Sequence, residues 1–75
     1  MPRLPALKAQ QIIRALKKAG LVEDRQKGSH LMMRHPETNA LTVIPVHARR
    51  TLKRPLVRSI LKDANISEAE LLEFL

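Results

Sequence analysis

The sequence predicts an α+β fold in which a three-stranded antiparallel sheet carries two helices on one face, with a short extra helix at the C-terminus. Three observations predict this class. An apolar stripe with helical spacing lies near the N-terminus, three β-type segments separated by turn residues follow, and a second helical stripe comes after them. The 75 residues are 44% apolar, which suits one packed domain over residues 1–75.

The first helix is predicted from Lys8 to Ala19, after an extended lead-in, Met1 to Leu7, that holds two prolines. Its stripe recurs at the spacing of one helix face and consists of Ile12, Ile13, Leu16 and Ala19. Gly20 follows, where a helix commonly ends in a left-handed residue.

Three strands are predicted next, at Leu21–Gln26, His30–His35 and Ala40–Val46. Lys27-Gly28 is the expected turn between the first two, and the turn formers of residues 36–39 connect the second to the third. Pro45 in the third strand cannot donate to a ladder, which indicates a sheet edge or a strand end.

A basic connection, His47 to Arg54, leads to a second helix that begins at Pro55 and runs to about Ala64. Asn65 suits the left-handed cap of that helix, and Ser67 opens a capping box for the last helix. The order α-β-β-β-α is that of a double-stranded-RNA-binding domain.

Composition limits the classes of function. Fourteen Lys and Arg against seven Asp and Glu give a formal charge of +7, which favours a polyanionic partner such as nucleic acid. The absence of cysteine excludes disulfides and thiolate chemistry. No apolar run is long enough to span a bilayer and no signal-peptide core is visible, so a cytoplasmic protein without membrane contact is expected.

The histidines do not form a metal site in this interpretation. His30 and His35 are an odd number of residues apart, so on a regular strand they point to opposite faces. Neither has an acidic residue at ligand spacing, and we expect no metal and no cofactor.

The predicted hairpin places His30 within reach of another histidine. If residues 36–39 form the loop, paired residue numbers sum to 75, His30 lies opposite Pro45, and His47 lies one diagonal step away on the same face. Diagonal neighbours are about 7–8 Å apart, a gap that one phosphate can bridge. His47 is therefore a candidate second catalytic or positioning residue.

An imidazole titrates near neutral pH, so His30 is a candidate general acid or base for cleavage of RNA, which carries its own nucleophile in the 2′-hydroxyl. Ser29 has no acidic relay and is expected to serve the turn, with a positioning role left open. Two groups of basic residues are candidates for RNA binding. The strand group is Arg25, Lys27 and Arg34, and the group before the second helix is Arg49, Arg50, Lys53 and Arg54.

The chain resembles the HicA toxin family of small RNA-cleaving toxins from bacterial toxin–antitoxin pairs. The matching segments follow the family's order and spacing: Ala19-Gly20, Arg25-Gln26-Lys27-Gly28-Ser29-His30, Ile44-Pro45-Val46-His47 and Arg58-Ser59-Ile60-Leu61-Lys62. The resemblance implies a single HicA-like domain, His30 as the catalytic residue, mRNA as substrate and a HicB-type antitoxin as partner. An apolar patch of Met32, Leu41 and Val43 on the same predicted face as His30 suits antitoxin docking.

Three functions stay open at this point. The first is a metal-independent endoribonuclease, the second is a non-catalytic RNA-binding domain that blocks translation, and the third is a basic module that binds only a protein partner. Cleavage that requires the 2′-hydroxyl distinguishes the first, and a steep loss of RNA affinity with salt distinguishes the second from the third.

Overall fold

The computed structural model describes residues 4–46 and 51–75. The described residues contain three helices: α1 (Ala9–Lys18), α2 (Arg54–Ala64) and α3 (Glu68–Phe74). The main sheet holds three strands in the order β2-β3-β4, with bounds Val22–Lys27, His30–Arg34 and Leu41–Pro45. All pairs are antiparallel, so the predicted α+β class is confirmed, and each predicted bound lies within about two residues of the observed one.

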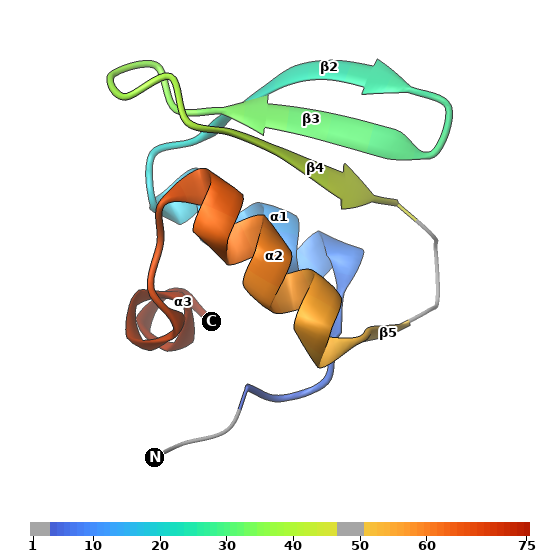
Figure 1. The fold of residues 1–75 in the computed structure, drawn as a ribbon, viewed down its shortest axis with the longest axis vertical. Helices are drawn as coiled ribbons and strands as arrows, with labels where there is room; N and C mark the ends of the chain where they lie inside the picture. The colour runs from blue at the N-terminus through green and yellow to red at the C-terminus, as the bar shows by residue number, and fades with distance from the viewer. Residues whose placement is uncertain (1–3, 47–50) are drawn as a thin grey trace.

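Both α1 and α2 lie against one face of the main sheet, and no described helix lies on the other face (Figure 1). We call the uncovered face the outer face. The opposite, inner face of β3 and β4 is buried, because alternate residues point toward the helices. Its side chains are Leu31, Met33, Thr42 and Ile44, each at most 4% exposed.

The register of β3 and β4 is the predicted one. Leu31 pairs with Ile44 and Met33 with Thr42, so paired numbers sum to 75, and His30 lies opposite Pro45. The sequence indicated a sheet edge or a strand end at Pro45, and both are observed. β4 is an edge strand of the sheet, and Pro45 is its last residue. A slip of one residue would turn the apolar inner row to water, so burial enforces this register.

The core continues into the helices. α1 buries Ile12 and Leu16 completely, and α2 buries Val57 completely and leaves Ile60 2% exposed. Thr42 joins sheet and helix directly: its Oγ1 donates a hydrogen bond of 3.1 Å to the carbonyl of Ile60. This bond satisfies a hydroxyl that would otherwise be buried without a partner.

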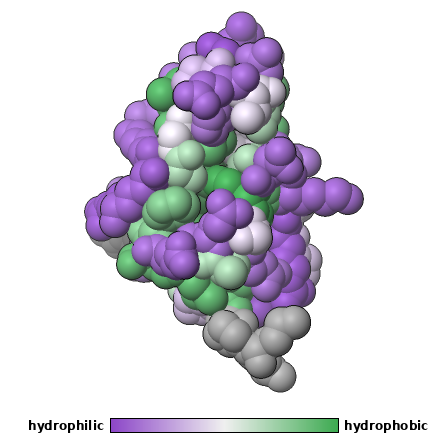
Figure 2. Space-filling model, turned by 90° about the vertical axis from the view of Figure 1, so that its left-hand side faces the viewer, coloured by the Kyte–Doolittle hydropathy of each residue, from purple (hydrophilic) through white to green (hydrophobic). Residues whose placement is uncertain are grey.

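The ends of the helices follow the expected chemistry. Asn65 caps α2 in the left-handed conformation (φ 64°), and Pro55 lies in the first turn of the helix. Ser67 and Glu70 form a reciprocal capping box at the start of α3, with hydrogen bonds of 3.1 and 3.2 Å. α3 packs against α1, on a side of the molecule where hydrophobic side chains lie between hydrophilic ones (Figure 2).

A second, two-stranded sheet was not predicted. β1 (Leu7–Lys8) pairs with β5 (Thr51–Leu52), although the sequence indicated an extended lead-in and a loop there. Leu7 and Leu52 are 2% and 6% exposed, so the pairing is held by burial between segments distant in sequence. Local propensity carries no signal for a ladder of two residues. Within the described residues, no helix is long and apolar enough to cross a membrane.

Gly20 and His35 fix the approach of α1 to the sheet. Gly20 has φ +104°, which side-chain-bearing residues rarely adopt, and a Cβ there would lie 2.9 Å from Nε2 of His35. The imidazole is not free to move away, because its Nδ1 accepts hydrogen bonds from the backbone amides of Glu37 (3.2 Å) and Thr38 (3.4 Å). His35 thus serves the turn after β3.

We therefore predict that Gly20→Ala lowers the free energy of unfolding by roughly 2–4 kcal/mol, through backbone strain and displacement of the His35 ring. Gly28→Ala is the matched control, because Gly28 also has a positive φ (+59°) but open space around its Cβ. It should cost only about 1 kcal/mol. Urea unfolding followed by circular dichroism measures both, and equal losses would contradict the role given to His35.

Candidate functional site

A two-residue turn at Gly28 and Ser29 joins β2 to β3 and positions His30. Gly28 supplies the positive φ, and its carbonyl accepts a hydrogen bond of 3.2 Å from the side-chain amide of Gln26. The carbonyl of Ser29 accepts one of 2.6 Å from the amide of Val46, just after β4. The turn is therefore tied to both neighbouring strands, and His30 is the first residue of β3.

The outer face of the sheet consists of three rows of paired residues, because residues opposite each other on antiparallel strands share a face. The rows across β2, β3 and β4 are Lys27-His30-Pro45, Arg25-Met32-Val43 and Val22-Arg34-Leu41. The expected position of His30 opposite Pro45 and on one face with Met32, Leu41 and Val43 is thus confirmed.

The third row depends on a β-bulge in β2. Pairing shifts by one residue between Glu23 and Arg25, so Val22 returns to the outer face while Glu23 pairs with Met33 of the inner face. Val22 was not identified from the sequence as part of this surface. A regular strand that places Lys27 and Arg25 outward would place Val22 inward, and no local pattern announces a bulge.

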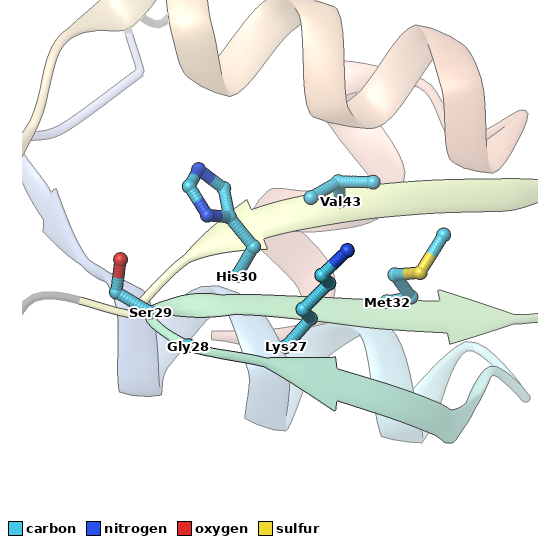
Figure 3. Close-up of a pocket in the computed structure, with 6 residues that line it drawn as sticks. All are labelled: Lys27, Gly28, Ser29, His30, Met32 and Val43. Atoms are coloured by element: carbon cyan, nitrogen blue, oxygen red, sulfur yellow. The ribbon is translucent and has the colours of Figure 1, made fainter.

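Six residues line an open depression of about 520 Å³ at the turn end of the outer face. We call it the His30 hollow, and its residues are Lys27, Gly28, Ser29, His30, Met32 and Val43. The side chains of Lys27, His30, Met32 and Val43 rise from the same side of the sheet (Figure 3). The hollow therefore combines an apolar floor with one imidazole, one ammonium group and one hydroxyl.

The cations of this face differ in how far they are free to bind a phosphate. Arg34 lies 3.8 Å from Asp24 through its Nε and donates a 3.2 Å hydrogen bond to Asn39, two rows away from His30. Lys27 and Arg25 are exposed and form no ion pair within residues 4–46 and 51–75. No acidic residue is among the described residues that line the His30 hollow, and Lys27 gives this lining a positive charge.

The predicted basic residues before α2 that the structure describes, Lys53 and Arg54, do not line the His30 hollow. Lys53 is the exposed N-cap of α2. Arg54 begins α2, and its Nε donates a 2.8 Å hydrogen bond to the carbonyl of Leu4, which ties this side chain to the N-terminal segment. His47, Arg49 and Arg50 lie outside the described residues, so the predicted proximity of His30 and His47 stays a prediction.

His30 and His35, the two histidines of the described chain, have different environments. His35 is partly buried and has both turn amides as donors to its Nδ1. The side chain of His30 is exposed and makes no hydrogen bond with any described residue, so both ring nitrogens are available to a ligand. Among the residues the structure describes, no three His, Asp or Glu side chains lie together as a metal-ligand set.

The arrangement defines a small α+β protein with a solvent-facing histidine on a basic, partly apolar sheet face. A family model described as "HicA toxin of bacterial toxin-antitoxin" matches residues 9–66, which include all three strands of the sheet and α2. The chain therefore belongs to the HicA toxin family, and it is a toxin of a toxin–antitoxin system with an antitoxin as partner. A search of curated proteins found no match.

Proposed function

We propose that this toxin is a metal-independent endoribonuclease that cleaves mRNA with His30 as general base. The observation that supports this most directly is the exposed imidazole in a hollow that also holds an ammonium group with no ion pair among the described residues. A general base must reach the proton that it abstracts, and an imidazole free at both nitrogens meets that condition. Membership of the HicA family supports the same activity.

In the proposed reaction the 2′-oxygen of the RNA attacks the adjacent phosphorus. The 2′-hydroxyl proton passes to a ring nitrogen of His30 as the new oxygen–phosphorus bond forms. The bond from phosphorus to the 5′-oxygen breaks, and the leaving oxygen takes a proton from water. The products are a 2′,3′-cyclic phosphate and a 5′-hydroxyl, and the imidazolium returns its proton to solvent. No oxidant, reductant or metal enters this balance.

The shape of the His30 hollow favours an unpaired RNA strand. The hollow is open along the outer face, so a strand can cross it without entering a deep cleft. Its floor is aliphatic, from Met32 and Val43, and the single aromatic residue of the chain, Phe74, lies on α3. Aromatic stacking of bases is therefore not available there, and contacts with the phosphate backbone carry the binding.

The partner that we propose is a HicB-type antitoxin that docks on the outer face and covers His30. This face carries three of the large hydrophobic side chains that the described chain leaves exposed: Val22 (45%), Leu41 (43%) and Val43 (38%). With Met32 they form an apolar strip beside the cations of β2. An apolar strip next to positive charge suits a protein surface that combines apolar anchors with carboxylates.

Cleavage is tested with an oligonucleotide that contains one ribonucleotide in a deoxyribonucleotide background, in excess EDTA. Wild type should cut only beside that ribonucleotide, and a 2′-O-methyl substitution there should abolish cutting. His30→Ala should bind the oligonucleotide with similar affinity and cut it about 10²–10⁴-fold more slowly. Its fold should persist, because the His30 side chain is exposed.

Two results decide against the proposal. If His30→Ala cuts as fast as wild type, His30 is not the base. If neither protein cuts while both bind RNA, the chain is an RNA-binding domain without chemistry.

Antitoxin docking is tested with Leu41→Asn, which removes an exposed apolar side chain from the row farthest from His30. We expect the affinity for the antitoxin to fall about ten-fold, which corresponds to a loss of roughly 1.4 kcal/mol of binding free energy from apolar contact. Leu56→Asn is the matched control, because Leu56 is similarly exposed (38%) but lies on α2. Titration calorimetry measures both, and equal effects of the two substitutions would exclude the outer face as the docking surface.

A further inference from the structure

We infer that Lys27 is a second catalytic group, whose ammonium binds the nonbridging oxygens of the phosphate that is being cleaved. This inference rests on the proposed RNA cleavage and names a residue that completes the same site. Three features support it: the strand register, the lining of the His30 hollow and the pattern of ion pairs.

The register places Lys27 directly opposite His30. They are the last residue of β2 and the first of β3, and the two-residue turn between them fixes this pairing. Directly opposed residues have Cβ atoms about 5 Å apart and side chains on the same face. A phosphate in contact with the imidazole therefore lies within reach of the lysine ammonium.

Figure 3 shows the lysine side chain extending across the hollow on the same side as the imidazole, with its amino group toward β4. Lys27, His30 and Val43 line the hollow from three different strands. The ammonium is therefore at the site of reaction, whereas a cation that only attracts RNA can lie anywhere along the path of the strand.

The other cations of the outer face do not meet these conditions. Arg34 is engaged by Asp24 and Asn39 in the row farthest from His30. Arg25 is unpaired in the described part of the chain, but it faces Met32, one row further along the sheet, and does not line the His30 hollow. Lys27 alone among these three combines the position opposite His30 with a free charge in the described structure.

The chemistry gives such a cation a defined role. As the 2′-oxygen attacks, the phosphorus acquires a fifth oxygen and negative charge grows on its two nonbridging oxygens. A cation already directed at those oxygens stabilises this charge more than the charge of the starting diester. Lysine suits the task, because its three rotatable donors follow the oxygens as the geometry changes.

The test compares steady-state cleavage of the one-ribonucleotide substrate by wild type, Lys27→Met, Lys27→Arg and Arg25→Met. Lys27→Met keeps the length of the side chain and removes the charge. We expect it to lower kcat on the order of 10²-fold with KM changed by less than about three-fold. Lys27→Arg should recover most of kcat, while Arg25→Met should mainly raise KM. Lys62→Met, on the last turn of α2, measures the effect of losing one remote positive charge.

A substrate with sulfur in place of one nonbridging oxygen gives a readout that a structural role would not alter. If the ammonium binds that oxygen, one thio diastereomer should slow wild type, and this rate difference should shrink toward unity in Lys27→Met. A Lys27→Met protein that resembles Arg25→Met in kcat, KM and thio effect would overturn the inference. Failure of wild type to cut at all would instead overturn the proposed function, so the two failures are distinguishable.

Discussion

The register of the three-stranded sheet is the constraint on which the rest of the molecule depends. The inner row of Leu31, Met33 and Ile44 is buried against the helices, and a one-residue slip would expose all three. The same register places His30 between Lys27 and Pro45 on the outer face. The apolar side of β3 thus determines which polar groups meet on its other side, and the packing of the core positions the proposed reacting groups.

The outer face has to satisfy two demands in the proposed function. RNA requires accessible cations around the imidazole, and an antitoxin requires enough apolar contact to hold a folded protein. The sheet separates these features by row, with Lys27 and His30 at the turn end and Val22 and Leu41 at the opposite end. Met32 and Val43 lie between them and belong to both. An antitoxin anchored on the apolar rows would therefore cover the His30 hollow, and inhibition needs no change in the toxin's shape.

Most of the fold could be predicted from the sequence, because apolar periodicity, Gly20, Asn65 and the Ser67 capping box are local signals with local causes. The hairpin register also followed from the length of its loop, and so did the position of His30 opposite Pro45. The bulge in β2 could not be predicted because no local pattern announces it, and the pairing of β1 with β5 could not because it joins segments far apart in sequence. The engagement of Arg34 by Asp24 was missed because Asp24 lies at this bulge.

In the proposed function, RNA crosses the outer face at the His30 hollow. Amide chemical shifts of isotope-labelled protein, titrated with an uncleavable 2′-O-methyl RNA, test it most directly. The largest changes should fall on the turn between β2 and β3 and on Met32 and Val43, and they should reverse with added salt. Changes confined to α1, whose Arg14 and Lys18 form a separate basic surface, would contradict it.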